Sequence, residues 1–167
     1  MRLLAKVTSI LLGSIVLTSC GVSAIIGNYN PQQEAKYDTI WNSAWNQIAK
    51  DSQPLKATST SPGVCNIGGS QQVCFDTDVK LIADYRLIGS KLSGSVVPSE
   101  FGKANRTFLE YVSATIKGLS SRDAAIVSQN PNASLTQSNN YLKTAETLIL
   151  KSLGEYRGPN KPSNPFS

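Results

Sequence analysis

The chain has no histidine among its 167 residues. Histidine is the commonest general base near neutral pH, so its absence excludes serine–histidine–aspartate and cysteine–histidine catalysis. The Ser-x-x-Lys spacing, through which a lysine can activate a serine, is missing as well. Without imidazole ligands we also expect no metal site, and the sequence offers neither a catalytic constellation nor a cofactor motif.

Clusters of lysine and arginine are missing too, although the formal net charge is +5. Nucleic-acid binding needs basic residues gathered in a patch, so we expect no nucleic-acid partner. Arg2 and Lys6 lie at the N-terminus, and without residues 1–19 the chain has 14 basic and 11 acidic side chains, a charge of +3. So small an excess is compatible with a position beside anionic lipid headgroups.

The sequence further lacks internal repeats of about 20 to 50 residues, which argues against a solenoid. No long window alternates between apolar and polar residues, so no strands are expected beyond a short pairing in a loop. Apolar residues instead recur every three or four positions in four long segments and one short one. This periodicity predicts an all-α fold, a small helical bundle of four to five amphipathic helices with a disulfide-closed loop.

Capping and breaking residues set the expected helix limits. The Ser-, Thr-, Pro- and Gly-rich segment from Asp51 to Val73 predicts a long loop after the first helix. The predicted helices run from Asn30-Pro31 to about Lys50, from Asp76 or Thr77 to Leu92, from Pro98-Ser99 to about Gly118, from Ser120 or Ser121 to Val127, and from Ser134 or Leu135 to Tyr156. The expected core includes Trp41, Ile48, Phe75, Ile82, Phe108, Val112, Leu142 and Ile149.

Three aromatic residues, Tyr37, Trp41 and Trp45, share one stripe of the first predicted helix. Most stripes of this kind are core. Two other interpretations remain open: a groove for an apolar ligand between helices, or indole rings resting at a membrane interface.

Carboxylates are the remaining candidates for acid–base chemistry. Asp76, Asp78 and Glu110 could serve an enzyme if two of them converged in a cleft. The ordinary interpretation is surface charge and helix capping, and the spacing does not match a calcium-binding loop.

The N-terminus has a positive start followed by a mostly apolar run from Val7 to Leu17, too short to span a bilayer stably. Leu17-Thr18-Ser19-Cys20 then resembles the lipobox of bacterial prolipoproteins, a likeness confined to the first twenty residues. The resemblance implies cleavage before Cys20, a diacylglyceryl group on its thiol and often an acyl chain, such as palmitate, on the new amine. Gly21 stands where the inner-membrane retention signal would be Asp, which allows the periplasmic face of the outer membrane if two membranes are present.

These features divide the chain into a signal peptide (1–19), a lipidated tether (20–30), an α-helical domain (31–157) and a flexible C-terminal tail (158–167). Cys65 and Cys74 are left as a pair in an oxidising compartment, which predicts a disulfide. Metal binding by two cysteines would lack the usual four ligands.

Three functions are compatible with this sequence. The first is a membrane-anchored extracytoplasmic lipoprotein, held in membrane lipid through the Cys20 acyl chains, that acts as a non-catalytic interaction or accessory module of the cell envelope, with an envelope protein as a possible partner. The second is a carrier or sensor of a small apolar ligand. The third is a carboxylate-dependent hydrolase.

Overall fold

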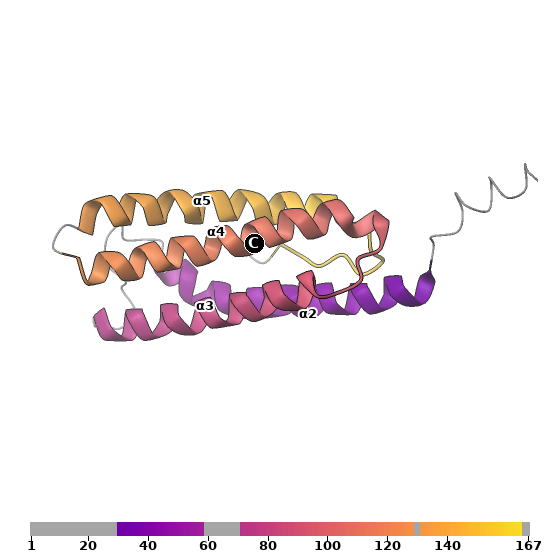
Figure 1. The fold of residues 1–167 in the computed structure, drawn as a ribbon, viewed down its shortest axis with the longest axis horizontal. Coiled ribbons are helices and arrows are strands. Elements are labelled where there is room, and N and C mark those ends of the chain that lie inside the picture. The colour runs from indigo at the N-terminus through magenta and orange to yellow at the C-terminus, as the bar shows by residue number, and fades with distance from the viewer. Residues whose placement is uncertain (1–29, 59–70, 129–130, 165–167) are drawn as a thin grey trace, which may run out of the picture. The chain divides into compact units, whose positions relative to one another are not determined.

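The computed structural model describes residues 30–58, 71–128 and 131–164, and all regular structure in these ranges is helical. The elements are α2 (Pro31–Thr58), α3 (Gln71–Ser93), the short 3-10 helix η1 (Ser99–Phe101), α4 (Gly102–Ile126) and α5 (Pro131–Glu155). Figure 1 shows the four long helices running alongside one another. One cluster of buried side chains draws on all four of them, so the predicted all-α bundle is confirmed. None of the described helices is both long and apolar enough to cross a membrane.

The first helix is longer than its apolar pattern. α2 continues to Thr58 instead of ending at about Lys50, so the predicted loop from Asp51 to Val73 begins too early. The apolar stripe stops at Ile48, but helical hydrogen bonding does not depend on that stripe. Gln47 donates a side-chain hydrogen bond to Asp51 one turn further along, at 3.0 Å.

The second helix also begins earlier than expected, at Gln71 rather than at Asp76 or Thr77. Asp76 is therefore not an N-cap. It lies inside α3 and accepts a hydrogen bond from Gln72, one turn earlier, at 2.8 Å. The rest of the predicted loop, residues 59–70, lies outside the described residues.

The short helix predicted to begin at Ser120 or Ser121 does not exist as a separate element, because α4 continues to Ile126. Its last turns are held by a contact with α3 that no local sequence pattern predicts. The guanidinium of Arg122 donates from Nε to Oδ2 of Asp78 on α3, at 2.7 Å.

The last helix begins at Pro131 rather than at Ser134 or Leu135. A proline suits the first helical position, because the backbone N–H that it lacks would have no partner inside the helix. Pro131 therefore opens α5, whereas α4 ends earlier, at Ile126. α5 ends at Glu155, one residue before the predicted limit.

α4 and α5 are joined by hydroxyl groups that bond to backbone across the interface. Ser152 donates to the carbonyl oxygen of Ala104 at 3.1 Å, and Ser138 donates to that of Gly118 at 2.7 Å. The two donors lie two heptads apart on α5, and the two acceptors lie two heptads apart on α4. The helices are therefore antiparallel and keep one register along their contact.

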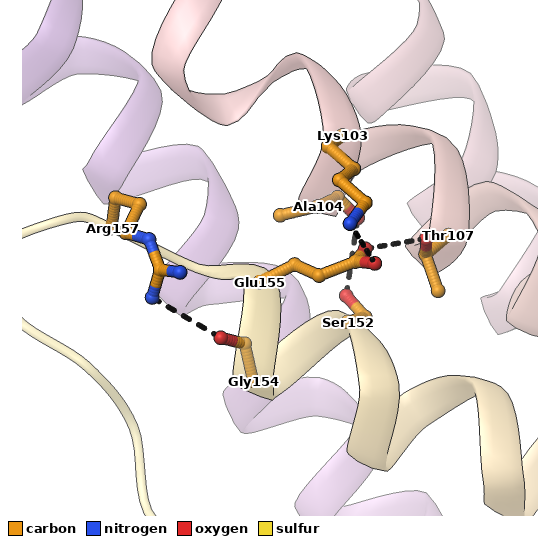
Figure 2. A network of polar contacts seen from close by, with 7 residues as sticks. All are labelled: Lys103, Ala104, Thr107, Ser152, Gly154, Glu155 and Arg157. Carbon is orange, nitrogen blue, oxygen red and sulfur yellow. Dashed lines mark hydrogen bonds and ion pairs between the residues drawn. The ribbon is translucent and has the colours of Figure 1, made fainter.

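A polar cluster adds to this interface at the start of α4 and the end of α5 (Figure 2). Glu155 accepts a hydrogen bond from Thr107 at 2.7 Å and forms an ion pair with Lys103 at 3.2 Å. Beyond it, Arg157 donates to the carbonyl oxygen of Gly154 at 3.3 Å, near the C-terminal end of the helix.

The predicted core is confirmed in most positions. Phe75 and Leu142 are exceptions, since both are only partly buried. The buried stripe of α3 lies one position away from Phe75 and includes Cys74 and Asp78. The predicted core residues that are buried are Trp41, Ile48, Ile82, Phe108, Val112 and Ile149.

Candidate functional site

A polar pocket lies between α2 and α3, with a volume of about 620 Å³. This volume is within the range of small-molecule sites, roughly 300 to 1,000 Å³. Exposed charged side chains stand at its rim, and buried side chains form its floor. Its lining residues are Gln47, Lys50 and Asp51 from α2, and Asp76, Thr77, Lys80, Leu81 and Asp84 from α3.

Asp51 is the buried carboxylate of this pocket, with only 7% of its surface exposed. Its Oδ1 accepts the hydrogen bond from Gln47, whereas its Oδ2 is buried without a hydrogen-bond partner. Burial raises the pKa of Asp51, and the nearby charge of Asp84 raises it further. The Gln47 hydrogen bond and the charges of Lys80 and Lys50 act in the opposite direction. A carboxylate with an unsatisfied oxygen is costly to bury, so this position is under electrostatic strain.

Two buried tyrosines lie within the electrostatic reach of Asp51. The hydroxyl oxygens of Tyr85 and Tyr111 form a hydrogen bond of 2.6 Å, and their rings meet edge to face. Burial raises the pKa of both phenols, and the charge of Asp51 raises it further. Both therefore stay neutral, and Asp51 borders a core that supplies no cation.

A second carboxylate cluster joins α3 to α4. Asp78 is fully buried, and its carboxylate accepts hydrogen bonds from Nε and from a terminal nitrogen of Arg122. Burial, followed by the charge of Asp78, raises the pKa of Asp123 to about 7. Asp123 Oδ1 is buried without a hydrogen-bond partner. None of these three residues lines the polar pocket, so their arrangement is that of a helix–helix contact.

The carboxylates considered for a hydrolase do not converge. Asp76 lines the polar pocket from an exposed position on α3, and Asp78 points into the contact with α4. Glu110 is an exposed residue of α4 and does not line the pocket. The structure therefore does not bring these three candidates together for acid–base chemistry.

The aromatic stripe is part of the core. Tyr37, Trp41 and Trp45 are 1%, 0% and 2% exposed, so all three are buried in the core. Trp41 stacks on Tyr156 with ring centroids 4.8 Å apart, and lies 4.6 Å from Phe108.

The polar atoms of the stripe have different environments. Tyr37 donates its hydroxyl to Asn105 at 2.6 Å, and Trp45 donates its indole N–H to the carbonyl oxygen of Ser163 at 2.9 Å. The indole nitrogen of Trp41 is buried without a partner.

Residues after α5 lie over α2, where two of them form hydrogen bonds with its side chains. Asp38 is a buried carboxylate that accepts hydrogen bonds from Tyr156 and, at 2.6 Å, from Asn160. Gly158 leaves room for this contact, because a Cβ at that position would lie 2.6 Å from Asp38 Oδ1. Residues 165–167 lie outside the described residues.

Two of the three cysteines, Cys20 and Cys65, lie outside the described residues, as do the predicted signal peptide and most of the tether. Cys74 is fully buried at the start of α3. The predicted Cys65–Cys74 bond thus stays a prediction. In the described part of the chain, no three acidic or cysteine side chains gather in a way that could hold a metal ion.

Asp51 was within reach of sequence reasoning. It lies three residues after Ile48, on the stripe that includes Trp41 and Ala44. A polar residue on the buried face of a helix is the signal that marks it. Asp78 is likewise on the buried stripe of α3, between Cys74 and Tyr85.

No protein-family model matches this chain, and no curated protein or solved structure shows significant similarity to it.

Proposed function

We propose that this chain is a membrane-anchored extracytoplasmic lipoprotein whose helical domain is a non-catalytic interaction module of the cell envelope. The likeness of Leu17-Thr18-Ser19-Cys20 to a lipobox supports the anchor. The observation that best supports a binding role is the polar pocket between α2 and α3, which is lined by carboxylates and lysines. Its volume of about 620 Å³ is large enough to hold a small molecule or a side chain of a partner.

The same geometry favours binding over catalysis. An acid–base enzyme would place two titratable groups around one accessible point, and the buried Asp78–Arg122 pair is occupied with joining two helices. A carrier of apolar ligands would need a hollow lined by apolar side chains. The aromatic residues near Trp41 are packed against each other instead.

The anchor is tested by Cys20→Ser. We expect the variant to incorporate no labelled palmitate and to leave the membrane fraction, because several buried acyl chains make attachment practically permanent. The matched control is Cys65→Ser, which should keep both the label and the membrane location. Unchanged membrane retention of Cys20→Ser would overturn the proposed anchor.

The interaction role is tested by photocrosslinking in cells. A photoreactive amino acid at Thr77, in the pocket wall, should capture a reproducible adduct, whereas the same group at the exposed Glu110 of α4 should not. Capture that is equal at both positions would contradict a binding role for the pocket.

We also propose that Cys65 and Cys74 form a structural disulfide. The buried position of Cys74 supports a structural rather than a reactive role. In the chain-entropy model a loop this small contributes about 2 to 3 kcal/mol. Mass spectrometry of non-reduced peptides should recover the linked pair, and free thiols at both positions would show the proposal to be wrong.

A further inference from the structure

The last two turns of α4, residues 120–126, bury little apolar surface. Leu119, just before them, is fully buried, but Ala125 is the only buried apolar residue within them. An alanine side chain adds little hydrophobic stabilisation, because the effect scales with the apolar area that is buried. The attachment of this segment to α3 therefore depends largely on polar contacts, foremost those between Arg122 and Asp78. A segment with few buried apolar contacts opens at a lower free energy than the core.

The polar contact at this end of α4 contains two carboxylates and one cation. Asp78 is fully buried, and its Oδ2 accepts the hydrogen bond of 2.7 Å from Arg122. Asp123, the next residue of α4, lies within hydrogen-bonding reach of Asp78, and its Oδ1 is buried without a partner among the described residues. One guanidinium balances one carboxylate, so the cluster is neutral only while Asp123 carries a proton. That proton also lets the Asp123 carboxyl donate a hydrogen bond to Asp78.

The segments around this cluster offer it no second cation. α4 packs mainly against α3 and α5. On α3, Asp76 and Lys80 line the polar pocket on the side of α2. α5 has no charged residue before Lys143, and the sequence contains none in 59–70 or in 127–130. The protonation of Asp123 is therefore governed by its burial and by the two groups it touches.

These surroundings make the opening of the segment depend on pH. Burial, followed by the charge of Asp78, raises the pKa of Asp123 from 3.8 to about 7, whereas Arg122 acts in the opposite direction. Lys117, the next cation along α4, lies over the ring of Tyr141. When the segment detaches, Asp123 returns to water and its pKa returns toward the ordinary value. Opening thus releases a proton and becomes more favourable as the pH rises between these two pKa values.

We propose that residues 120–126 form a proton-operated latch on α3, in which protonated Asp123 keeps the segment attached to Asp78 and loss of the proton releases it. This inference goes beyond the proposed function and needs neither the anchor nor the polar pocket. A domain outside the cytoplasm, as proposed above, would meet the pH of its surroundings directly. The latch would then make this end of the bundle respond to that pH.

The test is hydrogen–deuterium exchange of the full mature protein in detergent, measured between about pH 5 and pH 8 and corrected for the intrinsic exchange rate of each amide. We expect the protection of residues 120–126 to fall at least about tenfold between pH 5 and pH 7 and then to level off, because one proton changes the opening equilibrium by up to about tenfold per pH unit. Low concentrations of urea should hardly change this exchange, since a local opening exposes little surface.

Two variants identify the group that operates the latch. Asp123→Asn has nearly the same shape, stays neutral and can still donate to Asp78, so the protection of residues 120–126 should no longer depend on pH. Glu110→Gln removes an exposed carboxylate of the same helix and should keep the wild-type profile. Carboxyl ¹³C NMR of the wild type measures the titration of Asp123 directly and should place its pKa at about 7.

The latch is overturned by any of three results. The first is an equal pH profile in the wild type and in Asp123→Asn, whose circular dichroism should match that of the wild type. The second is a titration of Asp123 near its ordinary pKa. The third is exchange of residues 120–126 with the same urea dependence as the core of α4, which would show that the segment opens only when the whole protein unfolds. None of these measurements involves membrane attachment or a partner, so failure here leaves the proposed function untouched.

Discussion

Gly118 on α4 lies directly against Leu142 on α5. A Cβ at position 118 would come within 2.7 Å of Leu142 Cδ2 and 2.8 Å of its Cγ. At the same point the carbonyl oxygen of Gly118 accepts the hydrogen bond from Ser138. The close approach of the two helices therefore depends on the missing side chain.

Gly118→Ala should lower the free energy of unfolding by about 1 to 3 kcal/mol, because the added methyl group overpacks the interface. Gly154→Ala is the matched control: it is also in a helix, but apart from its chain neighbours and the nearby backbone of its own helix, nothing lies within 4 Å of the point that a Cβ at position 154 would occupy. That change should be neutral or stabilise by up to about 1 kcal/mol through helix propensity. Urea denaturation followed by circular dichroism measures both, and equal effects would contradict the close approach.

Arg122→Leu should destabilise the protein by about 3 to 5 kcal/mol, since it leaves the fully buried Asp78 without its cation. The double variant Asp78→Leu/Arg122→Leu should be less destabilised than Arg122→Leu alone, because no buried charge remains unpaired. The double-mutant cycle reports the coupling between the two residues. A double variant whose destabilisation equals the sum of the two single effects would show that the residues act independently.

The stability of the protein should fall as the pH rises from about 4 to 7. The pKa of Asp123 is raised from 3.8 to about 7 in the folded state, so across this window the folded protein retains a proton that the unfolded chain releases. Retained protons stabilise the folded state at low pH, and that contribution is lost as the pH passes the folded pKa.

Asp123→Asn should weaken this dependence of stability on pH. At about pH 8 the variant should be more stable than the wild type by on the order of 1 kcal/mol, once solvent screening is allowed for. Below about pH 4 the two proteins should be alike, since both lack the charge. Glu110→Gln should keep the wild-type dependence. Urea midpoints measured across the window test this, and parallel curves for wild type and Asp123→Asn would refute the assignment.

Ending the chain after Gly158 should expose α2. The truncation removes the hydrogen bonds from Asn160 to Asp38 and from Trp45 to Ser163. We expect a loss of about 1 to 3 kcal/mol, together with stronger acrylamide quenching of Trp45 fluorescence in a Trp41→Phe background. Ending the chain after Asn164 keeps both bonds and should change neither property.

The sequence predicts what depends on local periodicity. The apolar stripes locate four helices and most of the core, because spacing alone is enough to predict the burial of residues such as Trp41 and Phe108. They also misplace helix ends, since a helix can outlast its apolar stripe, as α2 does beyond Ile48.

What the sequence does not disclose are polar groups that are satisfied at a distance. Ser138 and Ser152 are buried because carbonyl oxygens of α4 accept their hydroxyl protons. Asp51 is a different case: its spacing from Ile48 marks it, and it falls in the predicted loop because a carboxylate seldom continues a buried stripe. The polar pocket follows from the pairing of α2 with α3, which no pattern within either helix determines.

The hydrogen bonds that bury Asp38 can form only late in the synthesis of the chain. Tyr156 and Asn160 follow Asp38 by 118 and 122 positions, so the ribosome makes the buried acceptor long before its donors. Until these residues have been synthesised, α2 contains a carboxylate whose hydrogen-bond donors are missing. The residues after α5 thus complete the contacts of α2, and a nascent chain stalled before Tyr156 leaves Asp38 without either of these donors.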